Sequence, residues 1–443
     1  MQRSGLSRRQ FLQTTAAGTV AGSISARATL RAQGANERLG VGFIGFGIRG
    51  PFLLQALEKV GGVEVRACCD LYDGRLKGIQ ERGYSNIQLT KRYEEILENK
   101  DVDVVVIATP DHWHKRCVLD SLDAGKDVYI EKPMTYRWSD AAIMEAAVKR
   151  TGRVLQVGSQ QASNPINDPA KEYIHSGKLG KITFISAAIF RNSPTGAWYY
   201  PIPPDASEQT IDWKRFIGDA PWHDFDPHRF FQWRLYWDYS GGLPTDLFVH
   251  MITLTHTLMN VSMPRRVTAM GGLFYWKEHR EVPDHMSALV EYEEGFVLSL
   301  TSSAAIGHRV PFLTVMGSEG TLEISETGTS MRYFKEPIRD SYWYSTLGWP
   351  EELRLRYYEE NDIDPQTHRP RNQPSGAQPE TVSAAGDNLQ RHMATFIEAV
   401  RNRQQPFEDV VFGGNAATVG HMVNLSYLGK RTVAWDPTTR QVV

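Results

Sequence analysis

The sequence predicts an α/β protein: a doubly wound Rossmann sheet of parallel strands, then a C-terminal α+β domain with a large, mainly antiparallel open sheet. Three observations predict this fold class. Apolar runs alternate with helix-period segments as far as about residue 157, and a glycine-rich turn at 45–50 directly follows the first run. After Pro165, consecutive strand-like runs are joined by short turns. Alternating strands and helices are typical of a parallel sheet, whereas consecutive strands indicate an antiparallel one.

The first domain is predicted to span residues 38–160. Its strand candidates are residues 39–44, 63–69, 102–108, 127–130 and 154–157, and its helix candidates are 52–59, 93–98, 112–124 and 139–149. The near-continuous valine and isoleucine run at 102–107 suits a parallel strand that is buried on both faces.

The second domain is predicted to span residues 161–443. A helix at 169–176 and a strand at 182–190 precede a long aromatic stretch and a helix at 245–258. Further strands are expected at 266–272, 286–292, 296–302, 312–317 and 321–324, and helices at 388–401 and 415–429. Residues 339–387 are polar and rich in proline, glutamine and asparagine, which predicts an irregular excursion or a flexible arm.

Residues 1–33 have the pattern of a targeting segment. The twin-arginine motif at 7–12 precedes a weakly apolar stretch, and 26–28 is a plausible cleavage site. We therefore expect export to the periplasm by twin-arginine translocation, a route that carries folded proteins. A basic amphipathic or disordered N-terminus is the alternative. No other stretch is long and apolar enough to span a bilayer.

The composition is that of an ordinary globular protein. The 443 residues are 41% hydrophobic and 23% charged, with a formal net charge of −2. This balance argues against nucleic acid or an anionic membrane as the main partner. The three cysteines, Cys68, Cys69 and Cys117, are expected to be core thiols, because they cannot form a disulfide framework.

The glycine turn is the most informative motif. Gly45 would make the tight turn, Gly47 would let the backbone approach a pyrophosphate, and Gly50 would let helix and strand pack closely. The following helix N-terminus offers unpaired N–H groups to phosphates. Asp70, twenty residues after Gly50, would accept hydrogen bonds from the adenosine ribose and repel a 2′-phosphate, which favours NAD over NADP.

Two further loops follow strands and should border the cofactor, because ligands gather at the carboxyl ends of parallel strands. The first is the loop at 109–114; its Asp-His-x-His pattern could also suggest a metal, but no partner cluster has convincing ligand spacing, so no metal site is predicted. The second contains Lys132, which could hold a substrate hydroxyl and stabilise a developing alkoxide, or could simply be a surface lysine in a turn.

Asp246 and His250 lie four positions apart on a predicted helix that a glycine-rich turn opens, so they share one face. Histidine is the natural proton acceptor near neutral pH, and a neighbouring carboxylate would orient it. The alternative is that Asp246 and His250 form an ordinary side-chain contact within a helix. Trp233 and Trp237, in the aromatic stretch close to this helix, are candidates for stacking on a sugar ring, although aromatic residues are also ordinary core material.

The predicted cofactor contacts are Gly45, Phe46, Gly47, Ile48, Arg49, Gly50, Asp70, Arg75, Thr109, Pro110, Asp111, His114, Glu131, Lys132 and Gln160.

Together these motifs resemble the glucose–fructose oxidoreductase / inositol dehydrogenase (Gfo/Idh/MocA) family. The turn at 45–50, the loop at 109–114, Glu131-Lys132-Pro133 and the stretch from Gly241 to His250 carry the resemblance, and 317–322 extends it. It implies a lysine–aspartate–histidine catalytic set, which falls on Lys132, Asp246 and His250, and an open C-terminal sheet that often mediates oligomers. A homo-oligomer, dimer or tetramer, is therefore expected. Pro244, the aromatic stretch and residues 339–387 depart from the general family pattern, so no member's substrate is transferred.

Three functions remain open at this point. The first is an exported NAD-dependent oxidoreductase acting on the CH–OH group of a sugar, polyol or glycoside. The second uses the same site with tightly bound NAD for a redox-neutral reaction, as a glycosidase, epimerase or lyase, or as a sugar–sugar transhydrogenase. The third is a non-catalytic, nucleotide-carrying sugar-binding protein.

Overall fold

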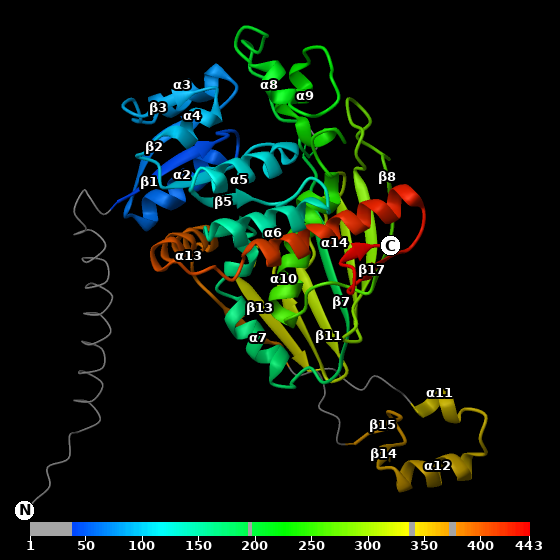
Figure 1. Ribbon diagram of the computed structural model, residues 1–443. Helices are drawn as coiled ribbons and strands as arrows, with labels where there is room; N and C mark the ends of the chain where they lie inside the picture. Colours follow the sequence, from blue (N-terminus) through cyan, green and yellow to red (C-terminus); the bar gives the residue numbers. More distant parts are fainter. Residues whose placement is uncertain (1–37, 194–196, 336–341, 372–377) are drawn as a thin grey trace, which may run out of the picture. The chain divides into compact units, whose positions relative to one another are not determined.

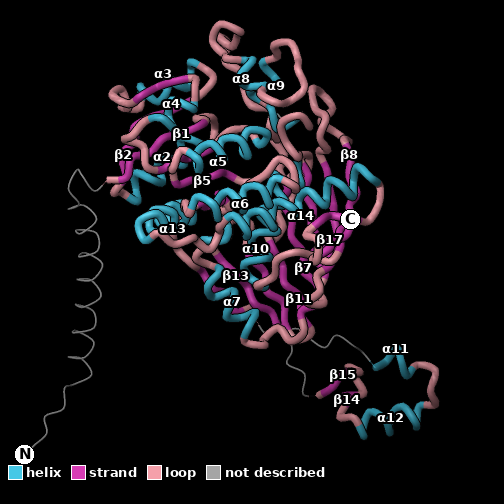
Figure 2. Tube along the Cα trace, viewed as in Figure 1, coloured by secondary structure: helices cyan, strands magenta, loops and turns pink. Residues whose placement is uncertain are grey.

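The computed structural model describes residues 38–193, 197–335, 342–371 and 378–443. The predicted signal segment at 1–33 lies outside these described residues. The chain divides into two compact units, and each contains a sheet of its own (Figures 1 and 2). The nucleotide-binding unit comprises the chain up to Gln160, Tyr200–Gly241 and Asp387–Thr418. The sheet unit comprises Gln161–Tyr199, Gly242–Gly386 and Val419–Val443.

The nucleotide-binding unit contains a six-stranded parallel sheet in the order β3-β2-β1-β4-β5-β6. The strands are β1 (Leu39–Ile44), β2 (Val63–Cys69), β3 (Gln88–Thr90), β4 (Val104–Ile107), β5 (Asp127–Glu131) and β6 (Leu155–Gly158). The helices between them are α2 (Gly50–Val60), α3 (Asp73–Glu81), α4 (Tyr93–Glu98), α5 (His114–Asp123) and α6 (Asp140–Thr151). This order confirms the predicted doubly wound Rossmann sheet.

Helices cover both faces of this sheet, which is why the central strand β4 is apolar at every position. Val104 and Val106 pack with residues of α2 and α13 (Asn388–Asn402). Val105 and Ile107 pack with residues of α4, α5, α6 and the start of α14 (Val410–Gly429) on the other face. Successive side chains of a strand point to opposite faces, so all four must be apolar here. Cys68, Cys69 and Cys117 are buried and free, as predicted, and burial raises the pKa of each thiol.

The sheet unit contains a ten-stranded sheet in the order β16-β13-β12-β11-β7-β10-β9-β8-β17-β18. The strands are β7 (Ile182–Phe190), β8 (Arg266–Gly272), β9 (His285–Glu291), β10 (Val297–Ser303), β11 (Leu313–Gly317), β12 (Gly320–Ile324), β13 (Ser330–Lys335), β16 (Glu380–Ser383), β17 (Val433–Asp436) and β18 (Gln441–Val442). Neighbouring strands pair antiparallel, except that β7 and β10 pair in parallel. The predicted second domain with a mainly antiparallel sheet is therefore confirmed.

This sheet alternates buried and more exposed residues along its strands. In β8, Val267 and Ala269 are buried whereas Met270 is 76% exposed, and in β9 Met286 is buried whereas Leu289 is 53% exposed. Helices α7 (Asn167–His175) and α10 (Val249–Met259) and the last part of α14 belong to the same unit. Period-two alternation is typical of a sheet that packs on one face and leaves the other open.

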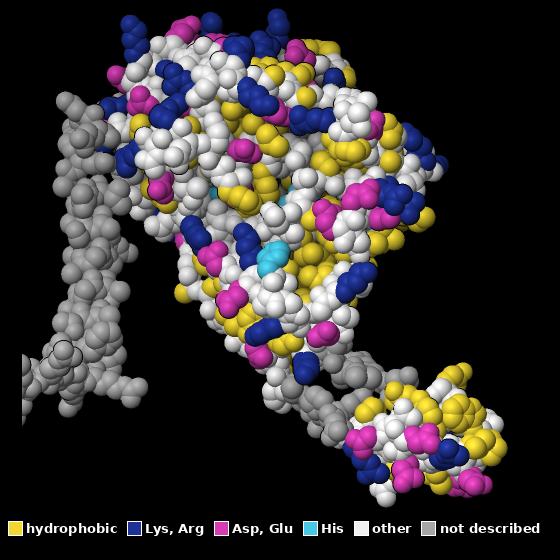
Figure 3. All heavy atoms as spheres, turned by 60° about the horizontal axis from the view of Figure 1, so that its bottom comes forward, with side chains coloured by type: hydrophobic (Ala, Val, Ile, Leu, Met, Phe, Trp, Pro, Cys, Tyr) yellow, Lys and Arg dark blue, Asp and Glu magenta, His cyan; other side chains and the backbone are white. Residues whose placement is uncertain are grey.

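Residues 342–371 form a small helical module where the sequence predicted an irregular excursion. It contains α11 (Tyr342–Thr346), α12 (Glu351–Glu360) and the short pair β14 (Ile363–Asp364) and β15 (Arg369–Pro370). The buried Tyr358 hydroxyl lies 3.1 Å from Thr346 Oγ1 and 3.1 Å from His368 Nδ1. Figure 3 shows hydrophobic side chains beside charged ones on this module. The prediction failed because α12 is polar at most positions, so the period that marks an amphipathic helix is weak.

Two later segments cluster with the nucleotide-binding unit rather than with the sheet unit. They are Tyr200–Gly241, which contains α8 (Trp213–Ile217) and α9 (Pro227–Phe231), and Asp387–Thr418, which contains α13. The sequence analysis placed both in the second domain, because nothing in their local pattern distinguishes them from the residues around them. The chain therefore crosses between the units several times.

Candidate active site

The turn after β1 has a backbone shape that only glycine adopts easily. Gly45 has a φ of +86°, and a Cβ atom there would lie 2.7 Å from Ala108 O. A Cβ at Gly47 would lie 3.4 Å from Arg75 Cζ. At Gly50 a Cβ would lie 2.8 Å from Phe46 Cδ2, so this glycine makes room for the Phe46 ring, whereas the sequence predicted room for helix and strand to pack.

Helix α2 begins where this turn ends, and its N-terminus is suited to an anion. Pro51 stands in its first turn, no side chain caps its first N–H groups, and its first turn contains no acidic residue. Backbone N–H groups without intrahelical partners and the positive end of the helix dipole favour phosphate at such a position. In the same turn, Ile48 is 50% exposed and the Phe46 side chain is buried.

Asp70 is buried at the end of β2 and binds the glycine turn directly. Its carboxylate accepts hydrogen bonds from Phe46 N at 2.7 Å and Tyr72 N at 3.1 Å, and Arg75 Nη1 lies 3.3 Å away. The sequence predicted hydrogen bonds from ribose hydroxyls to this carboxylate. A carboxylate has about four lone-pair sites, so a ribose hydroxyl would share Asp70 with these protein donors.

The loop after β4 carries the predicted contacts Thr109, Pro110, Asp111 and His114. Asp111 and His114 are buried, and Thr109 Oγ1 is a buried hydroxyl with no hydrogen-bond partner among the residues that the structure describes. His114 Nδ1 lies 2.8 Å from Pro133 O and Nε2 lies 3.1 Å from Thr109 O. Burial lowers the pKa of His114 to about 4, so the ring is neutral at pH 7 and has one N–H to donate to these two carbonyls.

Arg49 joins the glycine turn to the ends of two other strands. Its Nε donates to Glu131 Oε1 at 2.7 Å, at the end of β5. With its amide oriented to satisfy both partners, Gln160 after β6 donates to Gly158 O at 2.6 Å and accepts from Arg49 Nη2 at 3.1 Å. The structure therefore brings together three residues, Arg49, Glu131 and Gln160, that the sequence named separately as cofactor contacts.

Lys132 follows Glu131 directly, and its backbone N–H donates to Glu131 Oε2 at 3.2 Å. Its side chain is partly buried. The carboxyl ends of β1, β2, β4, β5 and β6 thus supply a glycine turn, a free helix N-terminus, an unpartnered Thr109 hydroxyl and fixed polar groups. This donor set fits a dinucleotide, and when bound NAD would supply a hydride acceptor at this edge of the sheet.

Asp246 and His250 belong to the sheet unit. Asp246 is 6% exposed and lies in a π-helical turn, Pro244–Phe248, which leads directly into α10 with His250 in its first turn. The sequence predicted regular α-helical spacing for this pair. A π-turn has more residues per turn, so it changes the direction of the Asp246 side chain relative to that expectation; such turns occur often at functional sites.

Trp233 and Trp237, the predicted sugar-stacking residues, lie in the nucleotide-binding unit and are both partly buried. The guanidinium of Arg234 lies 4.2 Å from the Trp233 ring centroid, and the Trp237 carbonyl accepts a hydrogen bond from Tyr136 at 2.7 Å. Trp222, by contrast, is 63% exposed.

Sequence reasoning missed the residues through which Tyr200–Gly241 binds the loops of the nucleotide-binding unit. His112 Nε2 and Trp113 Nε1 both lie 2.9 Å from Phe216 O, and burial lowers the pKa of His112 to about 4. Arg215 pairs with Glu94. The high aromatic content of the stretch was the available signal, but it could not say which part of the chain those rings cover.

Two family models match the chain. Residues 39–159 match the model described as "Oxidoreductase family, NAD-binding Rossmann fold", and residues 214–323 match the Gfo/Idh/MocA C-terminal domain. The chain belongs to the Gfo/Idh/MocA family. The predicted NAD cofactor and the predicted oxidoreductase class are thereby confirmed.

Individual curated relatives align with parts of the chain. It is 32% identical over 259 residues to a scyllo-inositol 2-dehydrogenase (NAD(+)) of Bacillus subtilis, covering 56% of this chain and 64% of that enzyme. It is 32% identical over 110 residues to an α-N-acetylgalactosaminidase of Shewanella oneidensis, covering 22% of this chain and 23% of that enzyme. The structure of levoglucosan dehydrogenase with NADH and levoglucosan matches 90% of this chain and 99% of its own, with a TM-score of 0.64 and 17% identity, which shows the common fold.

Two features are absent from the residues that the structure describes. No helix among them is long and apolar enough to cross a membrane. They contain no group of three or more histidine, cysteine, aspartate or glutamate side chains placed to hold a metal ion.

Proposed function

We propose that this Gfo/Idh/MocA protein is an exported NAD-dependent oxidoreductase that oxidises a secondary hydroxyl, or reduces the ketone, of a sugar, polyol or glycoside. The observation that carries the proposal is the Arg49–Glu131–Gln160 network, which ties the glycine turn to the strand end that bears Lys132. The name of the inositol dehydrogenase relative supports a polyol or sugar as the substrate class.

Each of three side chains has a separate role in the proposal. His250 takes the hydroxyl proton as the hydride leaves the substrate carbon. Lys132 holds the oxygen and stabilises the negative charge that develops on it. Asp246 orients His250 and raises its basicity. The sum of the step is conversion of CH–OH to C=O, with one hydride passed to the nicotinamide and one proton passed to the histidine.

A redox-neutral reaction is the second candidate, in which NAD stays bound and regains its oxidised form within each cycle. Oxidation of one ring carbon acidifies its neighbour, which permits glycoside cleavage, epimerisation or dehydration before the hydride returns. The alignment with an α-N-acetylgalactosaminidase favours this candidate. Export favours it too, because free NAD is scarce outside the cytoplasm; the twin-arginine motif at 7–12 supports export.

We also propose a homo-oligomer. The open face of the ten-stranded sheet, with Met270 and Leu289 largely exposed, supports association between subunits through this face.

The test begins with the purified protein. Mass spectrometry after denaturation should find NAD, and a panel of sugars, polyols and glycosides should produce the reduced-nicotinamide absorbance with at least one member. Net NADH from added NAD supports the dehydrogenase, and product without net nicotinamide change supports the redox-neutral cycle. No reaction with any of these compounds, with NAD bound, would favour a non-catalytic sugar-binding protein.

Lys132→Met and His250→Ala should each lower kcat by about 10²–10⁴-fold, as expected for removal of a positioned acid–base group. Lys149→Met is the matched control, because Lys149 is 74% exposed and pairs with Glu145 within α6. Activity of either site variant equal to that of the control would reject the assigned roles.

A further inference from the structure

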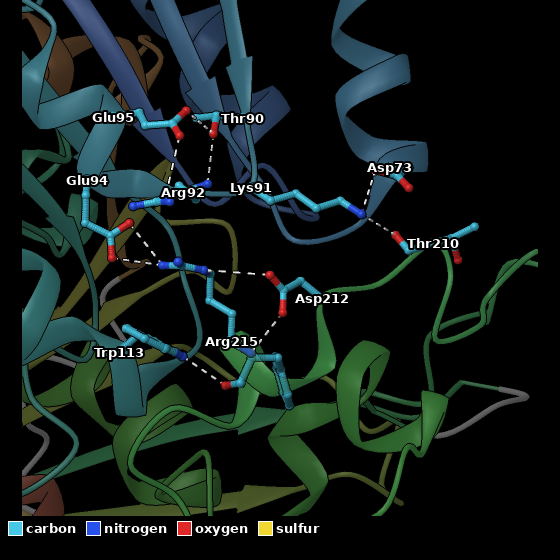
Figure 4. A network of polar contacts seen from close by, with 11 residues as sticks. Asp73, Thr90, Lys91, Arg92, Glu94, Glu95, Trp113, Thr210, Asp212 and Arg215 are labelled. Carbon is cyan, nitrogen blue, oxygen red and sulfur yellow. Dashed lines mark hydrogen bonds and ion pairs between the residues drawn. The ribbon is translucent and has the colours of Figure 1, made fainter.

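Residues 205–237, here called the strap, lie after β7 in the sequence but pack on the loops at the carboxyl ends of the parallel strands. They belong to Tyr200–Gly241, which clusters with the nucleotide-binding unit. Figure 4 shows part of this contact: Arg215 of the strap meets Glu94 of α4, and Lys91, which follows β3, reaches Asp73 and the Thr210 carbonyl.

The strap first pairs with the loop that follows Asp70. Ile211 forms an antiparallel bridge with Tyr72, flanked by hydrogen bonds from Asp212 N to Leu71 O at 2.9 Å and from Asp73 N to Thr210 O at 3.0 Å. The Tyr72 hydroxyl donates to Asp205 Oδ1 at 2.5 Å. The strap thus adds a short piece of strand immediately beside the residue that is predicted to bind the adenosine ribose.

Further contacts attach the strap beside β3 and α4. Lys91 Nζ lies 2.7 Å from Asp73 Oδ1 and donates to Thr210 O at 3.2 Å. Arg215 Nη1 contacts both carboxylate oxygens of Glu94, at 2.9 and 3.0 Å (Figure 4). Arg215 is held in addition by Asp212 at 3.7 Å.

The strap continues across the ends of the next strands. Phe216 O accepts from Trp113 after β4 and lies 2.9 Å from His112 Nε2, and Trp237 O accepts from Tyr136 after β5. Contacts therefore run from the loop after β2 to the loop after β5. A dinucleotide in a doubly wound sheet lies across these same strand ends.

Arg75 shows how close the strap comes to the glycine turn. Its guanidinium lies 5.2 Å from the Phe230 ring centroid and 5.4 Å from that of Phe231. The same group is 3.3 Å from Asp70 Oδ1, and its Cζ lies 3.4 Å from the position of a Cβ on Gly47. Two strap rings thus hold a cation against the turn that would bind the pyrophosphate.

We propose that the strap closes over bound NAD, so that the nucleotide is released only when the strap contacts break and is retained through many turnovers. This rests on the proposed function and narrows it. With a retained nucleotide, the hydride taken from a CH–OH carbon is returned either to the same substrate or to a carbonyl of a second sugar. His250 accepts a proton in the first half-reaction and gives one up in the second, so electrons and protons balance without an external oxidant.

The experiment measures how fast the holoprotein releases NAD. Protein loaded with isotopically labelled NAD is mixed with excess unlabelled NAD, and retained label is followed with time. We compare wild type with Tyr72→Phe, which removes the hydrogen bond to Asp205, and with Tyr72→Phe/Arg215→Met, which also removes the ion pair with Glu94 of α4. The matched control, Tyr84→Phe/Arg150→Met, removes a tyrosine–glutamate hydrogen bond and an arginine–aspartate pair elsewhere in the same unit.

We expect wild type and control to release NAD more slowly than they turn over. The double strap variant should release it roughly tenfold faster, the scale of losing one hydrogen bond and one partly exposed ion pair, and Tyr72→Phe should release it faster than wild type by a smaller factor. If wild type releases NAD faster than it turns over, the proposal that the strap retains NAD is wrong. It is also wrong if the strap variants melt normally and release NAD at the wild-type rate. If the double variant does not fold, Tyr72→Phe decides the comparison by itself. If the protein binds no NAD at all, both the proposed function and the proposed role of the strap are wrong.

Discussion

The two sheets of this protein have opposite surroundings. In the parallel sheet, adjacent residues such as Phe43 and Ile44 are both buried, one against each helical layer. In the ten-stranded sheet, Met286 is buried and Leu289, on the opposite face of β9, is 53% exposed. A sheet covered on both faces can offer ligands only the ends of its strands, whereas a sheet with an open face can offer that whole face to another molecule. The positions of the proposed cofactor site and of the proposed subunit contact follow this difference.

The largest effect expected from this contrast is on the free energy of unfolding. Phe43→Ala and Ile44→Ala should each destabilise the protein by about 2–5 kcal/mol, because each opens a cavity in one of the two cores. In β9, Met286→Ala should cost about as much, whereas Leu289→Ala should cost no more than about 0.5 kcal/mol. Urea unfolding at concentrations too low for association checks the four values. A cost for Leu289→Ala as large as that for Met286→Ala would show that the second sheet is not open.

Lowering the pH should reduce the stability of the nucleotide-binding unit more than that of the sheet unit. Burial lowers the pKa of His112 and His114 to about 4 in the first, and of His256 to about 3 in the second. These folded-state pKa values lie below the ordinary value of about 6.5. Between pH 6.5 and 4 the unfolded chain therefore binds protons that the folded chain does not. The free energy of unfolding falls as the pH falls, by up to about 1.4 kcal/mol per pH unit for each histidine.

Hydrogen exchange at pH 7 and pH 5, corrected for the intrinsic rate, measures this difference. Protection of β4 and β5 should fall more than protection of β9 and β10. His114→Gln should reduce the loss in β4 and β5 and leave β9 and β10 unchanged. An equal loss in both sheets would contradict the assignment of the acid-sensitive groups.

Leu289→Lys should have the smallest effect on the stability of the subunit, but it should clearly lower the mass of the assembly. A charge on the open face should prevent its burial between subunits, because an unpaired charge is costly to desolvate. Sedimentation velocity should show a smaller particle than for wild type, with subunit unfolding changed by no more than about 0.5 kcal/mol. Ile143→Lys, on α6 and 47% exposed, is the control and should keep the wild-type mass. If the mass of Leu289→Lys equals that of wild type, the open face is not the contact between subunits.

The sequence predicted most elements of both sheets, because local periodicity determines them. Residues 39–44, 63–69, 182–190 and 266–272 are strands with the predicted bounds. Helix α3 was missed because it contains Gly74 and Gly78 and buries only Ile79, so it carries no amphipathic period. The glycine turn could be predicted because its residue types are imposed by backbone geometry, as the φ of +86° at Gly45 illustrates.

What the sequence determined by itself, then, was the order of strands and helices, the glycine turn, and the placing of Asp70, Thr109 and Lys132 at strand ends. Only the tertiary structure decided that Arg49 joins Glu131 to Gln160, that Asp246 lies in a π-turn, and that the strap packs on the nucleotide-binding loops. The physical reason is range. Periodicity and turn chemistry act between residues a few positions apart, whereas Tyr72 and Asp205, 133 positions apart, meet only because the packed chain brings them together.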